Sequence, residues 1–464
     1  MQLTSWVGIF FWGFLVVYGA MMYWLSPRTV TIGGFFNGED SEGRKASPFL
    51  LTTSIFISWI FAKSVTNAAN LGAEFGLVGG LAYATYWLSI PLCGLVIYRL
   101  RRHFGATGMV QFLTSHYGRA AALAFTAAIL IRLFNEVWSN TAVVGGYYGE
   151  SGSIEFIGAA LLFTAVTLAY SLRGGLRSSI LTDAAQAAIF VIALVAVLGL
   201  VLPQHSPSEL ASTSSWALNA GVDLLLVACL QLVSYPFHDP VLTDRGFISE
   251  EKSMLKAFGV AGVLGFFAIL AFSLIGVHAD LVGIAASGNV PAELARALGL
   301  GALVVMTIVM ISAAGSTLDS TFSSLAKLVG RELPALAGKD LGRKALGVGM
   351  STMVVFALLG NLPMLAGTDI LKATTISGTM VMGLAPVFVL HGLVRPTRAG
   401  FHLSFWTGLA LGVALTLGWI PAGWAIGDGK YALLLGTNLY GLLLCTALYL
   451  LTGWLQRSRS RVAA

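Results

Sequence analysis

The chain has 464 residues, of which 56% are hydrophobic and only 10% are charged, and its formal net charge is +6. This composition excludes a soluble globular domain and predicts an integral membrane protein with many helical spans. The basic residues are scattered at the ends of apolar segments, which excludes a nucleic-acid-binding patch. The three cysteines have no metal-ligand spacing, so we expect neither a structural metal nor a disulfide framework.

Hydropathy and helical periodicity predict about thirteen membrane-spanning helices. The first apolar stretch has no basic region before it, so we interpret it as a span and not as a cleaved signal. The spans are expected at about 5–25, 48–72, 76–99, 119–147, 154–172, 179–202, 217–244, 255–279, 300–328, 343–364, 369–392, 400–423 and 430–454. A short surface helix is expected between spans eight and nine, at Pro291-AELARAL.

Lysine and arginine residues concentrate in every second loop. Only Arg296, Lys372 and Lys430 fall in the loops of the opposite side, while Lys63 and Arg132 lie within spans. Because cytoplasmic loops carry an excess of basic residues, this bias predicts an outside N-terminus and a cytoplasmic C-terminus. We therefore expect a multi-pass protein of the cell inner (plasma) membrane.

The second span carries an ionisable residue near its middle, in Pro48-FLLTTSIFISWIFAKSVTNAANLGAEF-Gly76. A charged side chain there costs roughly 2.5–3.5 kcal/mol on insertion scales, so Lys63 is expected to face the bundle interior and to have a partner. Three partners are open at this point: Glu136 of span four, Asp239 of span seven, and a transported solute.

Spans four and six each carry further charged residues. Arg132 and Glu136 are four residues apart in span four, so they share a face, and we interpret them as a structural ion pair. Span six follows Arg173-GGLRSSILTDAAQ, whose glycine pair predicts a tight turn. Asp183 lies about one turn into that helix, where it either favours the N-terminal helix dipole or serves an ion.

Span seven ends in Gln231-LVSYPFHDPVLTDRG. Pro236 and Pro240 are expected to interrupt this helix and to release backbone carbonyls. Broken helices near the membrane midplane indicate a transporter binding site. His238 is either a site residue or a satisfied core histidine, and we expect Asp244 and Arg245 at the inner surface.

Span nine contains Ser312-AAGSTLDSTFSS. Small residues and hydroxyls of this kind favour close helix packing. Ser316, Thr317 and Asp319 also supply oxygen atoms, which are the ligands that hard cations prefer. Packing and ion binding are both compatible with this stretch when it is considered alone.

These segments resemble the solute:sodium symporter family, which includes the sodium/proline and sodium/galactose symporters. Arg173-GGLRSSILTDAAQ is similar to the family's Gly-Gly-x-Arg…Thr-Asp-x-x-Gln stretch, and Ala313-AGSTLDS to its Ala-Ala-x-x-Ser-Thr/Ser segment. Tyr235-PFHDPVLTDRG resembles Phe-Gly-Gln-Pro-x-x-x-x-Arg of the sodium/proline symporter, and Phe35-FNG more loosely resembles Tyr-Phe-x-Ala-Gly-Arg. The resemblance implies an all-α, LeuT-like 5+5 inverted repeat. The N-terminal helix would be 5–25, the repeats about 48–202 and 217–392, and the two C-terminal helices 400–454.

The resemblance also implies a sodium site between spans two and nine. Its ligands would be the backbone carbonyls of Ile57, Ile60 and Ala313 and the hydroxyls of Ser316 and Thr317. Asp183 matches a family carboxylate near this ion, and Asp319 is a second ion-coupling candidate. The sequence departs from the family at Asn67-AAN in span two and at His238 and Asp239 in span seven, so the family's sugar and proline specificities do not transfer.

The sequence thus predicts a sodium-coupled symporter that imports a small polar, carboxylate-bearing organic solute by alternating access. The substrate-binding candidates are Lys63, Ser64, Asn67, Glu136, Gln231, Tyr235, His238 and Asp239. One alternative is a transporter-like sensor. Another is a symporter for a neutral amide or urea-like solute, in which Lys63 replaces a second sodium ion. No nucleophile–base pair indicates an enzyme. The expected partners are the solute, Na⁺ and the lipid bilayer, without nucleic acid, and the sequence specifies no oligomeric state.

Overall fold

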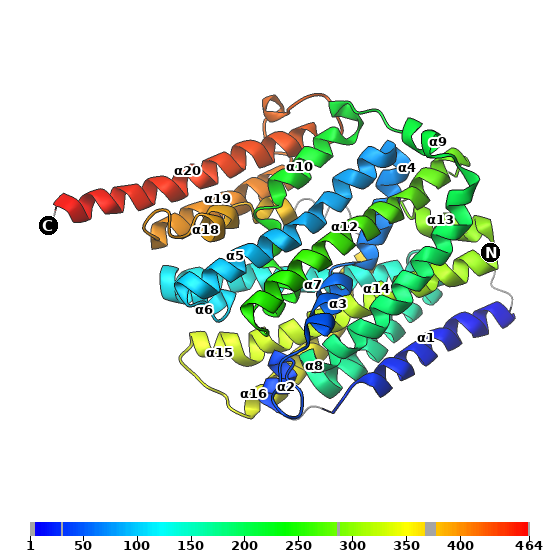
Figure 1. The fold of residues 1–464 in the computed structure, drawn as a ribbon, viewed down its shortest axis with the longest axis horizontal. Coiled ribbons are helices and arrows are strands. Elements are labelled where there is room, and N and C mark those ends of the chain that lie inside the picture. Colours follow the sequence, from blue (N-terminus) through cyan, green and yellow to red (C-terminus); the bar gives the residue numbers. More distant parts are fainter. Residues whose placement is uncertain (1–4, 29–30, 285–287, 367–376, 463–464) are drawn as a thin grey trace.

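The structure is a computed structural model that describes residues 5–28, 31–284, 288–366 and 377–462. The described residues form helices and no β-strand, as Figure 1 shows. Nine helical segments among them are long and apolar enough to cross a membrane. The longer helices are α1 (Ser5–Leu25), α4 (Ala62–Ala84), α5 (Ser89–Phe104), α7 (Arg119–Tyr148), α8 (Ile154–Val201), α12 (Glu251–Leu281), α14 (Leu300–Lys327), α16 (Lys344–Leu359), α19 (Arg398–Thr416) and α20 (Ala432–Val462).

Two of these nine segments extend over more than one predicted span. Ala62–Phe104 joins the second half of span two to span three, and Ile154–Gln204 joins spans five and six. Each contains one glycine with a left-handed backbone, Gly76 (φ 62°, ψ −144°) and Gly175 (φ 54°, ψ −135°). Glycine adopts this conformation without the steric cost that a side chain would add, so the helical direction breaks at these two positions. The predicted glycine turn before span six is confirmed.

Span two is broken near its middle. Helix α3 (Pro48–Ser58) begins with Ser47 as a side-chain cap and Pro48 in the first turn, an arrangement typical of helix starts. The helix ends at Ser58, and Phe61 has an extended backbone before α4 begins at Ala62. The break therefore places non-helical backbone inside the bundle, beside Lys63.

Span seven is broken as the two prolines predicted. Helix α10 (Asp223–Gln231) is followed by the 3₁₀ turn η4 (Tyr235–His238), the short helix α11 (Pro240–Thr243) and a second 3₁₀ turn, η5 (Asp244–Gly246). The eleventh predicted span begins at residues 367–376, which lie outside the described residues, and continues through α18 (Leu384–Val389). The predicted surface helix is confirmed as α13 (Val290–Leu298).

Helices α4 and α12 pack with their backbones in direct contact. A Cβ atom added at Gly72 would collide with the carbonyl of Ser273, and one added at Gly276 would collide with the carbonyl of Ala69. Small residues permit this close approach between membrane helices. The two helices therefore form one unit on one side of the break in span two.

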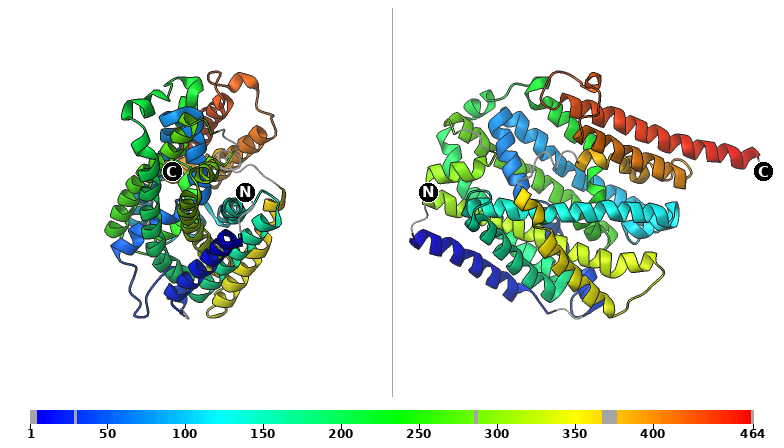
Figure 2. Two further views of the ribbon diagram at one scale, coloured as in Figure 1. Left: turned by 90° about the vertical axis from the view of Figure 1, so that its right-hand side faces the viewer. Right: turned by 180° about the vertical axis from the view of Figure 1, so that it is seen from behind.

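The edges of the bundle are formed by the terminal helices. Helix α1 lies at one edge, and α19 and α20 lie side by side at the opposite edge (Figures 1 and 2). Large apolar side chains on the outer faces are exposed, among them Ile131, Ile192, Phe267 and Leu358. Such a surface suits contact with lipid hydrocarbon. With the nine apolar segments, it indicates a multi-pass membrane protein.

Candidate transport site

The end of α3 packs against the middle of α14, where the sequence places the sodium ligands. The Thr317 hydroxyl lies 3.4 Å from the carbonyl oxygen of Ser58 and donates to that of Ala313 at 3.1 Å. The Ser316 hydroxyl lies 3.3 Å from the Ser58 hydroxyl. All of the predicted ligand residues are completely buried, namely Ile57, Ile60, Ala313, Ser316 and Thr317. The geometry therefore brings together hydroxyl and carbonyl oxygens from two helices.

Asp183 lies inside the bundle beside these hydroxyls. Its carboxylate accepts hydrogen bonds from Ser316 and, at 2.5 Å, from Ser54. It also pairs with Arg245 at 3.1 Å, and both side chains are fully buried. The prediction that Arg245 lies at the inner surface is wrong. The alternative of Asp183 at an aqueous helix start is also wrong, because the residue lies two turns beyond Gly175 and makes no solvent contact.

The Arg245 guanidinium is surrounded by serine hydroxyls from three helices. It donates from Nε to Ser54 at 2.7 Å, and from Nη2 to Ser58 at 3.0 Å, Ser320 at 2.8 Å and Ser179 of α8 at 3.4 Å. These contacts link η5 to α3, α8 and α14. A buried charge needs such partners because desolvation is expensive.

Asp319 is a second buried carboxylate in the same region. It accepts hydrogen bonds from Tyr170 at 3.0 Å and Thr182 at 3.1 Å, both on α8. Among the described residues, no basic side chain forms an ion pair with it. Asp319 therefore differs from Asp183, whose charge is balanced by an arginine.

Lys63 belongs to a buried group of four charged side chains. Its ammonium lies 2.7 Å from Glu136 and 3.2 Å from the Ser139 hydroxyl. Arg132 pairs with the same Glu136 and also with Asp239, at 3.0 Å. The predicted Arg132–Glu136 pair is thus confirmed, and of the three partners considered for Lys63 the structure supplies Glu136. We refer to Lys63, Arg132, Glu136 and Asp239 as the charged quartet.

An aromatic cavity lies beside the charged quartet. Its volume is about 20 Å³, which is enough for about one water molecule. Its lining comes from the break in span two, from α4 with the following 3₁₀ turn η1 (Thr85–Leu88), and from η4 of span seven. The lining residues are Trp59, Phe61, Ser64, Tyr83, Tyr86, Trp87 and Tyr235.

The remaining predicted substrate residues lie around this cavity, and some of them contact its wall residues from behind. Asn67 donates to the Tyr83 hydroxyl at 3.1 Å, so it supports a wall residue. Gln231 accepts from the Tyr86 hydroxyl at 2.8 Å and therefore lies behind the wall. The His238 Nδ1 lies 2.5 Å from the backbone oxygen of Tyr235. Asp239 caps α11 through the Val241 amide and accepts from Trp59.

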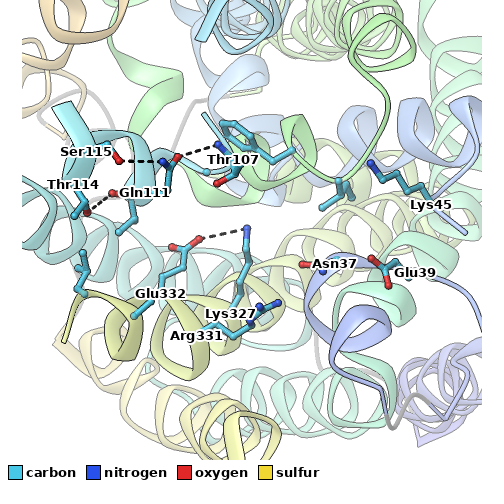
Figure 3. Close-up of a pocket in the computed structure, with 16 residues that line it drawn as sticks. Asn37, Glu39, Lys45, Thr107, Gln111, Thr114, Ser115, Lys327, Arg331 and Glu332 are labelled. Atoms are coloured by element: carbon cyan, nitrogen blue, oxygen red, sulfur yellow. Dashed lines mark hydrogen bonds and ion pairs between the residues drawn. The ribbon is translucent and has the colours of Figure 1, made fainter. Parts of the chain in front are cut away.

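Figure 3 shows a larger pocket of about 630 Å³. It is lined by the segment after α2 (Ile32–Asn37), by α6 (Met109–Tyr117) with the residues before it, and by the C-terminal continuation of α14. Lys327 stands in it and bridges Asp244, at 2.5 Å, and Glu332, at 3.5 Å. All of its lining segments come from loops that the sequence assigns to the cytoplasmic side.

Sequence reasoning missed several residues of the site. Ser54 and Ser58 are four residues apart on one face of α3, a spacing that indicates a shared polar surface. The aromatic run from Tyr83 to Trp87 lies in an apolar span, where it is typical of packing as well as of a binding wall. Arg245 lies at the end of the broken span seven. Because basic residues at the ends of hydrophobic segments usually lie at the membrane surface, nothing in the sequence indicated that it is buried.

Comparison with known proteins supports a transporter assignment. Residues 41–237 match the sodium:solute symporter family. Urea-proton symporter DUR3 of Oryza sativa subsp. japonica is 23% identical over 200 residues, which are 42% of this chain and 28% of that protein. Sodium/glucose cotransporter 4 of Danio rerio is 26% identical over 178 residues, which are 37% of this chain and 26% of that protein. The match thus spans about a quarter of the length of these relatives.

Solved structures show the likeness over nearly the whole chain. A substrate-bound, outward-open Na⁺-coupled sialic acid symporter has a TM-score of 0.75 at 13% identity and covers 96% of this chain and 97% of its own. The nucleobase-cation-symport-1 family transporter Mhp1, in a closed conformation with bromovinylhydantoin bound, has a TM-score of 0.59 at 14% identity and covers 93% of this chain and 97% of its own. The predicted LeuT-like fold is therefore confirmed, and so is the resemblance of the chain to the sodium:solute symporter family, whose model it matches over residues 41–237.

Proposed function

We propose that this protein is a sodium-coupled symporter that imports a small polar solute by alternating access. The observation that carries the proposal is the contact between the Ser316–Thr317 hydroxyls and the broken end of α3. Oxygen atoms from two helices meet there, and a hard monovalent cation is the ligand that such a set suits. Sodium bound at this place would join α3 to α14. Asp183 supports it by orienting the Ser316 hydroxyl, and Asp319 remains an ion-coupling candidate.

The solute site of this proposal is the aromatic cavity at the two broken helices. Trp59 of span two and Tyr235 of span seven pack edge to face there, with ring centroids 6.1 Å apart. The pocket around Lys327 is then the cytoplasmic vestibule, in a protein with its N-terminus outside and its C-terminus in the cytoplasm. The inverted repeats are proposed at about 48–202 and 217–392.

The sequence leaves two alternatives for the charge of the solute, an anionic carboxylate and a neutral amide or urea-like compound. A carboxylate-bearing solute remains a prediction that depends on a Lys63 ammonium free to bind it. The amide or urea-like alternative gains support from the pairing of Lys63 with Glu136 and from the similarity to urea-proton symporter DUR3. A transporter-like sensor would bind the same solute without moving it.

Removing the hydroxyls of Ser316 and Thr317 by alanine substitution is expected to weaken sodium binding by at least about tenfold, because a polar contact to a charged group contributes ~1.5–3 kcal/mol. The measurement is the rise in Tm of the purified protein in detergent as sodium chloride replaces potassium chloride. Thr307→Ala removes a hydroxyl that bonds only within α14 and serves as the control.

An equal sodium response in the double variant and the wild type would contradict the sodium site. Uptake of a bound solute into proteoliposomes then separates transport from sensing. A sodium gradient should drive it, and a proton gradient in sodium-free buffer should not. Uptake that is equally fast under the proton gradient would move the coupling role to protons.

A further inference from the structure

We infer that the solute carries no net charge, and that the charged quartet excludes ions from the aromatic cavity. This inference rests on the proposed function, because it assigns the substrate class of that same site. The first step is that the quartet contains two cations, Lys63 and Arg132, and two anions, Glu136 and Asp239. Each cation contacts an anion, and all four side chains are at least nine-tenths buried. The cluster is therefore balanced without any ligand.

The second step concerns an anionic solute. The Lys63 ammonium already lies 2.7 Å from one carboxylate, and Asn140 holds the other oxygen of that carboxylate at 3.0 Å. An incoming carboxylate would have to compete with Glu136 and would leave the quartet with an uncompensated negative charge. An unpaired charge in a buried apolar site is expensive. The geometry thus disfavours an anion.

The third step concerns a cationic solute. Aromatic walls commonly attract cations to their ring faces. Here Lys63 lies 5.1 Å from the ring centroid of Phe61, and Arg132 lies 5.4 Å from the ring centroids of both Phe61 and Tyr235. Two fixed cations already use these rings, so a third cation would be repelled by them.

The fourth step is what the cavity offers instead. Among the lining residues, the polar side-chain groups are the hydroxyls of Ser64, Tyr83, Tyr86 and Tyr235 and the indole N–H groups of Trp59 and Trp87, all neutral at physiological pH. Hydroxyls both donate and accept hydrogen bonds, and aromatic rings provide flat apolar contact. A compact, uncharged, polar molecule such as an amide, a urea or a small polyol matches this lining.

The test compares small solutes that differ in charge and hardly in shape. The probes are acetamide with acetate, propionamide with propionate, and urea with guanidinium, each titrated at millimolar concentrations at which urea and guanidinium do not denature proteins. The titrations are monitored by Tm and by the tryptophan fluorescence, to which Trp59 and Trp87 contribute, in saturating sodium chloride. Uncharged members are expected to raise Tm and change the fluorescence, and their charged counterparts are expected to do neither. The proposal is overturned if only charged members stabilise the protein, or if no uncharged member does.

A cavity variant locates the binding. Ser64→Val adds methyl groups to a space for about one water molecule, so it is expected to weaken amide binding by about tenfold or more. Ser171→Val, on α8, is the matched control because its hydroxyl bonds only within its own helix. An unchanged response to amides in Ser64→Val would also overturn the proposal.

Failure of the inference and failure of the proposed function give different results. If amides stabilise the protein equally with and without sodium while no sodium-driven uptake is observed, the inference of an uncharged solute holds and the proposed sodium symport is wrong. If sodium drives uptake of propionate but not of propionamide, the proposed sodium symport holds and the inference of an uncharged solute is wrong.

Discussion

Replacing Glu136 by glutamine is expected to destabilise the protein by about 3–5 kcal/mol, because it leaves buried cations without one of their two counter-charges. Glu136 contacts both Lys63 and Arg132, and no solvent reaches it. The surviving carboxylate, Asp239, already pairs with Arg132 and accepts from Trp59. Thermal unfolding of the purified variant in detergent measures the loss.

A second substitution distinguishes charge imbalance from lost packing. Lys63→Met removes the surplus positive charge of the Glu136→Gln variant, so the pair of substitutions is expected to be more stable than Glu136→Gln alone, with a coupling of about 0.5–3 kcal/mol. Glu150→Gln, at an exposed position before α8, is the control and should stay within about 0.5 kcal/mol of wild type. A Glu136→Gln protein as stable as wild type would contradict the balanced quartet.

Arg245→Gln is expected to lower stability by about 3–5 kcal/mol in potassium chloride, because Asp183 then loses the cation that balances it. Sodium chloride should restore part of this loss, since Asp183 holds the hydroxyl of the proposed sodium ligand Ser316. The rise in Tm between the two salts should therefore be larger in the variant than in the wild type.

The exposed Arg343 provides the matched control, and Arg343→Gln should resemble wild type in both salts. Equal losses for Arg245→Gln in both salts would show that Asp183 has no link to sodium. No loss in either salt would contradict the buried Arg245–Asp183 pair itself.

Much of the fold could be predicted because lipid imposes simple rules on the chain. Long apolar segments predicted the spans, prolines predicted the break in span seven, and a glycine pair predicted the turn at Gly175. The break in span two contains neither proline nor glycine at Trp59–Phe61. It is held by contacts with other helices, such as the bond from Trp59 to Asp239, so local sequence could not locate it.

The site was predicted unevenly for a related reason. Residue type alone identified Lys63, Asp183 and the Ser316–Thr317 pair as unusual within apolar spans. Glu136 was only one of three partners open for Lys63, and Arg245 was expected at the inner surface, because both residues reach their partners from helices far away in the sequence. Ion pairing in a helical bundle depends on the rotation of each helix, which short-range periodicity does not determine.

The glycine contacts between α4 and α12 limit how the cavity can open. Because Gly72 and Gly276 bring the two backbones together without intervening side chains, the first half of α4 cannot pivot independently of α12. The hinge for any opening then falls on Trp59–Phe61, the one stretch of span two with non-helical backbone that is free of this contact. Helices α4 and α12 would then rotate together about this hinge. The parts of α12 far from the hinge would move most, and Ser64, which lies next to it, would move least.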